Sequence, residues 1–153
     1  MKRVLSVAVV LAAMFAVFGA SNADDKATKV EKVNCVVAGK EIKIADAKVA
    51  SYKGAKVYVC CAGCKGKVEK TPAKFATKAN HQLTLTGQAK QVKCPLAGRP
   101  SDSSKTVDIA GVKVAFCCGG CQGKAKAAKG DAQIELAFSD KAFAKGFKVN
   151  AKK

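Results

Sequence analysis

One cysteine pattern occurs twice in this chain of 153 residues, and it constrains the fold more than any other feature. In the first copy Cys35 lies 25 residues before the pentad Cys60-Cys61-Ala62-Gly63-Cys64. In the second copy Cys94 lies 23 residues before Cys117-Cys118-Gly119-Gly120-Cys121. Four thiols per unit is the ligand count of a tetrahedral thiolate site, and the even total also suits a disulfide framework.

The composition indicates that these cysteines stabilise the fold. Aromatic residues make up 6% of the chain and Trp is absent, so large side chains for a core are scarce. A unit of about 45 residues with so few of them buries little apolar surface and usually needs a metal or disulfides.

The net charge of +17 comes almost entirely from lysine, since Arg3 and Arg99 are the only arginines. A basic chain attracts acidic partners. However, the lysines are scattered, and the arginine forks and stacking aromatics of nucleic-acid readers are missing. We therefore expect a solvated surface and no nucleic-acid partner.

Residues 1–23 have the pattern of a secretory signal peptide. Lys2 and Arg3 precede an apolar run over 4–18, and Ser21 and Ala23 provide small residues at the cleavage site. The run is too short for a spanning helix, which needs roughly 20 apolar residues. We expect export to the periplasm or secretion without a membrane anchor, and a mature chain over 24–153.

Matching turns and hairpins are predicted in the two copies. Cys35 and Cys94 each open a Cys-x-x-Ala-Gly-basic sequence, which is typical of a tight turn closed by glycine. Strand-forming residues flank Gly54 and Gly111, which predicts a hairpin whose second strand runs into each pentad.

Helices are predicted after each hairpin. Residues 63–70 and 120–127 follow the pentads, and Thr71-Pro72 starts a further helix over 73–79 that carries Phe75. A helix is also expected over 131–138. Ser139 then caps a last short helix that holds Phe143 and ends near Gly146.

The predicted fold class is small α+β, with two tandem ββα cysteine-rich modules of treble-clef or zinc-knuckle type. Residues 24–31 form a flexible leader, 32–80 the first module, 81–90 a linker, and 91–153 the second module with C-terminal helices. The linker holds His81, the only histidine, and a strand or turn over 84–87. His81 could be a metal ligand, but it belongs to neither cysteine set, so we interpret it as an ordinary linker histidine.

The pentads suit thiolate chemistry. Strand alternation places Cys60 and Cys61 on opposite sides, unless Ala62-Gly63 turns the chain so that both sulfurs meet Cys64. A helix N-terminus lowers a thiol pKa and favours thiolate. Four thiolates suit Zn²⁺, and two or three suit Cu(I).

Two other interpretations remain open. An exported chain can form two disulfides per copy instead of binding metal, and sequence cannot choose the pairing. The pentads also contain C-x-x-C motifs, which could exchange thiols and disulfides. Catalytic Ser/His/Asp sets, phosphate loops and convincing carboxylate pairs are missing from the sequence, so we expect no enzyme.

The order of Cys35, Tyr52-Lys53-Gly54, Cys60, Cys64 and Thr71-Pro72-Ala73-Lys74-Phe75 resembles the YHS/TRASH-type cysteine-rich metal-binding modules. The second copy matches at Cys94, Gly111, Cys117 and Cys121, but lacks the Tyr and the Pro-x-x-Phe. The two-copy arrangement is also similar to exported tandem proteins of planctomycete-type bacteria.

The resemblance implies binding, sensing or trafficking of a heavy metal through Cys35, Cys60 and Cys64 and through Cys94, Cys117 and Cys121. Cys61 and Cys118 depart from the family pattern and could complete a Zn²⁺ site or leave a thiol for transfer. We therefore expect Zn²⁺ or Cu(I) as the cofactor and partner, and possible contact with another metal-handling protein. The candidate ligands are Cys35, Cys60, Cys61, Cys64, Cys94, Cys117, Cys118 and Cys121.

Overall fold

The computed structural model describes residues 30–150, so the predicted signal peptide and most of the predicted leader lie outside the described residues. Within this range the fold is small and mixed, with five α-helices and four two-stranded antiparallel sheets. This agrees with the mixed fold class expected from the sequence. None of the helices in residues 30–150 has the length and hydropathy required to cross a membrane.

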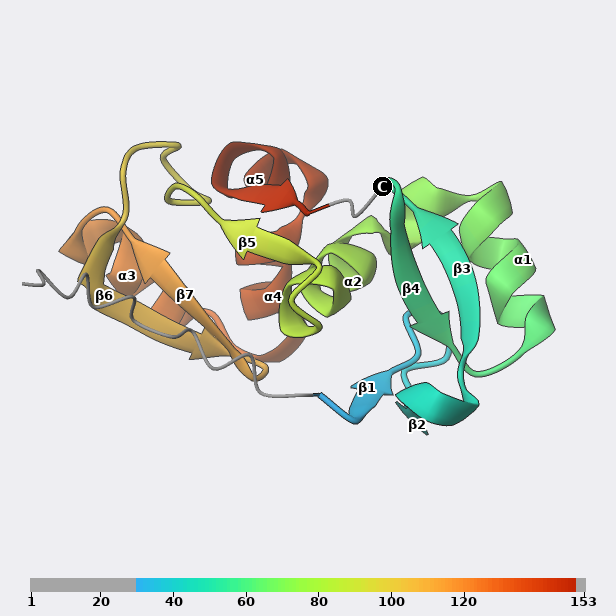
Figure 1. Ribbon diagram of the computed structural model, residues 1–153. Coiled ribbons are helices and arrows are strands. Elements are labelled where there is room, and N and C mark those ends of the chain that lie inside the picture. The colour runs from blue at the N-terminus through green and yellow to red at the C-terminus, as the bar shows by residue number, and fades with distance from the viewer. Residues whose placement is uncertain (1–29, 151–153) are drawn as a thin grey trace, which may run out of the picture.

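The first half of the fold runs from β1 to α2 (Figure 1). Two antiparallel pairs come first, and two helices follow them. The elements are β1 (Lys32–Asn34), β2 (Glu41–Lys43), the 3-10 turn η1 (Ile44–Asp46), β3 (Lys48–Tyr52), β4 (Ala55–Val59), α1 (Ala62–Lys70) and α2 (Pro72–Leu85). β1 pairs with β2, and β3 pairs with β4.

The second half runs from β5 to β8. A hairpin is again followed by helices, and the first and last strands of this half pair with each other. The elements are β5 (Ala89–Gln91), β6 (Asp102–Ile109), β7 (Val112–Phe116), α3 (Gly119–Ala127), α4 (Gly130–Phe138), α5 (Asp140–Gly146) and β8 (Phe147–Val149).

The two predicted hairpins are confirmed. Both turns place two residues at positive φ, Lys53 (50°) and Gly54 (76°) in the first and Ala110 (49°) and Gly111 (84°) in the second. Two-residue turns of this kind match the right-handed twist of the strands that they join. In each hairpin the second strand therefore runs directly toward a pentad.

α2 is longer than predicted. Thr71 is its N-cap and Pro72 its first residue, as expected, but the helix continues to Leu85 through much of the predicted linker. Buried residues at helical spacing, Ala79 and Leu83 among them, extend the apolar face beyond residue 79. The turn comes only at Gly87, which has a φ of 71°. The predicted strand or turn over 84–87 is therefore a helix end followed by a turn.

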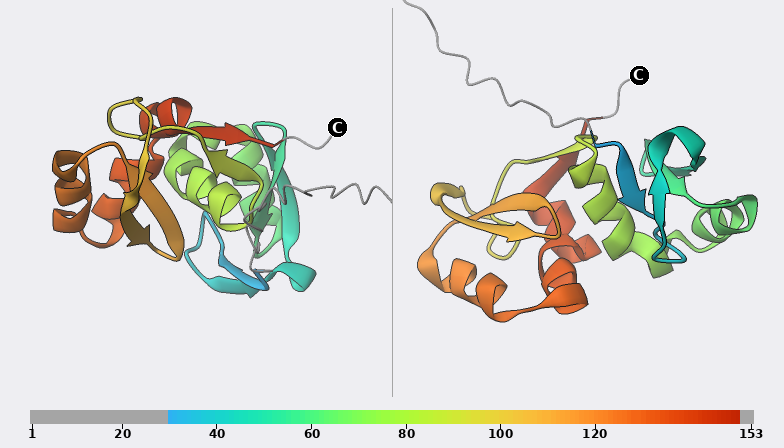
Figure 2. Two further views of the ribbon diagram at one scale, coloured as in Figure 1. Left: turned by 60° about the vertical axis from the view of Figure 1, so that its left-hand side comes forward. Right: turned by 90° about the horizontal axis from the view of Figure 1, so that it is seen from below.

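α2 lies between the two hairpins (Figures 1 and 2). It packs on β4 of the first half and on β7 and α4 of the second. One continuous hydrophobic cluster includes Leu83 of α2, Val59 of the first half, and Phe116 and Phe138 of the second. The two cysteine-bearing halves thus share a core, and their division into modules at residues 80 and 91 remains a prediction.

Candidate metal centres

The upstream cysteine of each copy lies on a tight turn, as the sequence predicts. In the first turn the Cys35 N–H donates to Lys40 O (2.8 Å), and the Gly39 N–H donates to Cys35 O (2.8 Å). The Cys94 turn has the same two bonds at the same lengths. Gly39 and Gly98 both have a φ near 70° (68° and 69°), which favours glycine at these positions.

The pentads join a strand to a helix. Cys60 follows β4, Cys61 is the N-cap of α1, and Cys64 is the third residue of that helix. Cys117, Cys118 and Cys121 occupy the same places after β7 and at the start of α3. The chain bends at the first two cysteines of each pentad, just before the predicted point, because Ala62 and Gly63 already belong to α1. The first and last sulfurs of each pentad converge.

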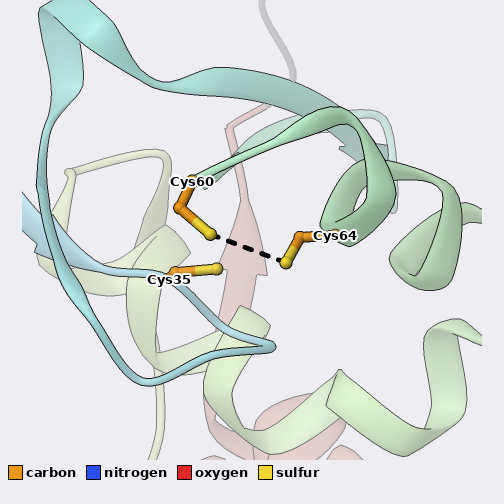
Figure 3. Close-up of side chains that lie close together, drawn as sticks. All are labelled: Cys35, Cys60 and Cys64. Atoms are coloured by element: carbon orange, nitrogen blue, oxygen red, sulfur yellow. Dashed lines mark hydrogen bonds between the residues drawn. The ribbon is translucent and has the colours of Figure 1, made fainter.

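Three sulfurs meet in each half. The Sγ atoms of Cys35, Cys60 and Cys64 all lie within 4.8 Å of one another, and their side chains point to a common centre (Figure 3). The Sγ atoms of Cys94, Cys117 and Cys121 form a second group with the same limit. We call these groups the first and second trios.

The spacing of the sulfurs fits a bound ion. The Cys60 and Cys64 sulfurs are 3.6 Å apart, and those of Cys117 and Cys121 are 3.8 Å apart. A tetrahedral ion with metal–sulfur bonds near 2.3 Å places its sulfurs about 3.8 Å apart. All eight cysteines lie in the described range and are free thiols there. Each trio can therefore hold a metal ion with little movement of its ligands.

The ligands of each trio differ in their exposure to solvent. Cys35 and Cys94 are fully buried (both 0% exposed), whereas Cys60 and Cys117 are half-buried. An ion in either trio would thus be covered by the cysteine turn and remain approachable from the pentad side.

Cys61 and Cys118 lie beside the trios rather than within them. Cys61 is exposed, and Cys118 is half-buried with its sulfur 3.8 Å from the Cys117 sulfur. Each is the N-cap of the helix that carries the last cysteine of its trio. Coordination by four thiols in each half remains a prediction.

Backbone hydrogen bonds lower the pKa of both turn cysteines. Burial alone would raise the pKa of Cys35, but the backbone N–H groups of Ala38, Cys60 and Val37 donate to its sulfur and lower the pKa. The pKa of Cys94 is lowered by the corresponding N–H groups against the same effect of burial. Such donors supply part of the charge balance that a thiolate ligand needs.

The pentad cysteines differ among themselves. The backbone N–H of Cys121, with its thiol and that of Cys117, lowers the pKa of Cys118 to about 7. Burial, followed by hydrogen bonding to the Cys118 sulfur, raises the pKa of Cys121 to about 12. In the first half the hydrogen bond to the Cys61 sulfur, together with burial, raises the pKa of Cys64 to about 12. Crowded thiols cannot all ionise without a cation, and a bound metal ion would remove that obstacle.

His81 belongs to neither trio. Its Nε2 atom lies 3.1 Å from Ala110 O and 3.3 Å from Ile109 O, and its ring meets the Phe138 ring edge-on. Because both oxygens are acceptors, Nε2 carries the proton. His81 thus ties α2 to the turn of the second hairpin.

Two glutamines that the sequence did not single out hold the backbone around the trios. Gln82 of α2 and Gln91 of β5 each make three hydrogen bonds to main-chain atoms beside the ligand cysteines. Gln82 follows the first pentad, whereas Gln91 precedes the second cysteine turn. Alignment of the two copies therefore gives no signal that would find them.

Comparison with protein-family models, curated proteins and solved structures yields no significant match in any of the three.

Proposed function

We propose that the chain is an exported, non-enzymatic protein that binds one soft metal ion, Zn²⁺ or Cu(I), in each half. Its role would be metal storage or trafficking, or the ions would stabilise the fold. The observation that carries the proposal is the pair of trios, whose sulfur spacings of 3.6 and 3.8 Å match coordination by thiolates.

The ligand set proposed for each ion is a trio together with its neighbouring pentad cysteine, Cys61 or Cys118. Three sulfurs satisfy Cu(I), and the fourth completes a tetrahedral Zn²⁺ site. The order of hairpin, pentad and helix in both halves supports the further proposal that each is a ββα cysteine-rich module related to the YHS/TRASH type.

Two other functions compete with metal binding. A disulfide-stapled interaction module would need sulfur pairs about 2.05 Å apart, well below the spacing within the trios. A thiol–disulfide exchange protein would use the low pKa of Cys118 and the lowered pKa of Cys61 for attack. Insulin reduction that disappears in Cys61→Ser and Cys118→Ser variants would favour this last function.

Native mass spectrometry of the protein purified from the periplasm tests the proposal. We expect two metal ions per chain and a protein mass with all eight thiols reduced. A mass short by eight hydrogens, with no metal, would instead establish the disulfide-stapled module.

A further inference from the structure

The side chain of Gln82 joins the two backbone segments that carry the ligands of the first trio. Its Nε2 atom donates to Asn34 O (2.9 Å) and to Tyr58 O (3.0 Å), and its Oε1 atom accepts from the Tyr58 N–H (2.6 Å). Asn34 directly precedes Cys35, and Tyr58 lies two residues before Cys60. One amide group therefore fixes the approach of two ligands.

Gln91 makes the same three bonds in the second half. Its Nε2 atom donates to Lys93 O (2.9 Å) and Ala115 O (2.5 Å), and its Oε1 atom accepts from the Ala115 N–H (2.9 Å). Lys93 directly precedes Cys94, and Ala115 lies two residues before Cys117. The bonded positions match those of the first half atom for atom.

The two glutamines reach these positions from unrelated parts of the fold. Gln82 extends from the fourteen-residue helix α2, and Gln91 from the short strand β5. Because the copies do not share the residue at equivalent sequence positions, simple repetition of the sequence does not account for the shared contacts. What the two halves have in common is the set of main-chain atoms that the amide holds.

These contacts join parts of the chain that no strand pairing joins. β1 pairs with β2, and β4 pairs with β3, in separate sheets. In the first half the Gln82 amide bridges those sheets from a buried position (2% exposed) with all its bonds made. Buried amides that lose their partners cost free energy, so this bridge favours a single arrangement of the two segments.

We propose that Gln82 and Gln91 are positioning residues that hold each trio in its binding geometry before an ion arrives. The inference depends on the proposed metal binding and adds what sets the affinity of each site. Loss of an outer contact that orients metal ligands typically lowers metal affinity about 10- to 100-fold. Each glutamine acts on its own half only, since its bonds reach only one trio.

Gln88 offers a matched control. Its side chain bonds the N–H and C=O of Lys56 in β4, both at 2.8 Å, as the other two amides bond Tyr58 and Ala115. Within residues 30–150 its side chain makes no hydrogen bond to the Cys35 turn. A Gln88→Met substitution thus removes the same kind of strand contact without releasing a ligand turn.

The test is a Zn²⁺ competition titration against a chromophoric chelator, on the full chain with Gln82→Met, Gln91→Met or Gln88→Met. We expect each of the first two variants to weaken one ion about tenfold and leave the other unchanged. Gln88→Met should bind both ions as the wild type does. Adding Cys117→Ser or Cys60→Ser, which leaves a single trio, identifies the weakened site.

The outcomes separate the two proposals. A wild-type chain that binds no ion contradicts the proposed function itself. A wild type that binds two ions tightly supports the proposed function. If Gln82→Met and Gln91→Met then leave both dissociation constants unchanged, or weaken binding equally at both sites, only the positioning role is contradicted. If the buried Gln82→Met variant fails to fold, the half-buried Gln91 decides the question by the same criteria.

Discussion

The two halves build the same trio but support its upstream turn in different ways. The Cys35 turn is the connection within the β1–β2 pair. In the second half the end of α5 supports the turn, since Gly146 O accepts the N–H groups of Val92 (2.7 Å) and Lys93 (3.1 Å). The supports differ while the sulfur geometry is retained, which indicates that ligand placement is the feature common to both halves.

The hairpin turns differ in the same manner. Tyr52 and Lys53 of the first turn donate to Asp140, whose carboxylate also accepts from Asn80. The second turn instead offers its carbonyl oxygens to His81. The Tyr-Lys pair that is missing from the second copy thus belongs to contacts between the halves, outside the metal centres.

Loss of one trio sulfur is the largest change and separates the two sites. We expect Cys60→Ser and Cys117→Ser each to release one Zn²⁺ ion and keep the other, because the trio that sets the binding geometry then has only two sulfurs and the neighbouring cysteine does not restore the third. The metal-to-protein ratio after dialysis, from plasma mass spectrometry, would fall from two to one in either variant.

Cys61→Ser and Cys118→Ser are the controls for that experiment. Both should retain two ions at weaker affinity, with the greater weakening for the half-buried Cys118. Complete loss of an ion in Cys61→Ser would contradict the separation of trio from neighbour.

The buried side chains that directly precede the two pentads differ in size. Phe116 directly precedes Cys117, and Val59 directly precedes Cys60, and both are fully buried. Phe116→Ala should lower the free energy of unfolding by about 3–5 kcal/mol, because truncation leaves a large cavity. Val59→Ala removes fewer buried atoms and should cost less. Urea denaturation of the metal-loaded protein measures both, and equal losses would show that the cavity had closed.

The support of the Cys94 turn by α5 can be broken by one methyl group. A Cβ at Gly146 would lie 2.7 Å from Pro95 Cα and 2.9 Å from Pro95 N, which forces the backbone apart. We expect Gly146→Ala to lower the free energy of unfolding by about 1–3 kcal/mol. It should weaken metal binding at the second trio more than at the first.

Gly66→Ala in α1 is the matched control, since a Cβ there meets nothing within 4 Å. That substitution should stabilise the helix by about 0.5–1 kcal/mol, because glycine disfavours a helix interior. Thermal unfolding and metal titration of each site compare the Gly146→Ala and Gly66→Ala variants. A Gly146→Ala variant as stable as the wild type would contradict the close packing on Pro95.

The contact of His81 with the second turn should depend on pH. Burial lowers the pKa of His81 more than its bonds to Ile109 O and Ala110 O and the charge of Asp108 raise it. The unfolded chain therefore takes up the proton first, and this stabilisation is complete above about pH 6.5 and declines as pH falls.

For one proton the free energy of unfolding changes by at most about 1.4 kcal/mol per pH unit. Urea denaturation of the wild type and of the His81→Gln variant between pH 7.5 and pH 5 measures this dependence. Their difference in free energy of unfolding should shrink as pH falls, and parallel pH profiles would contradict the role given to His81.

The local elements could be predicted from the sequence because their signals are short. The glycines at 54 and 111 mark hairpin turns, the pentads mark helix starts, and Ser139 marks the start of α5. Cysteine spacing singled out all eight cysteines, the family resemblance implied the six that form the trios, and the closeness of these six is confirmed.

The parts that could not be predicted depend on contacts between distant segments. β5 and β8 pair across more than fifty residues, and the β5 sequence Ala-Lys-Gln carries no strand signal of its own. The extension of α2 and the bonds of Gln82 and Gln91 likewise depend on packing between the halves. The periodicity of a sequence predicts which face of a helix or strand is buried, but not which other element packs against that face.

The most direct test of the central account is X-ray absorption at the metal edge of the protein loaded with two Zn²⁺ ions. We predict a shell of three to four sulfurs at about 2.3 Å, without nitrogen from His81, and the same shell in Cys60→Ser and Cys117→Ser chains that each hold one ion. A shell dominated by nitrogen or oxygen at about 2.0–2.1 Å would contradict metal binding by the trios.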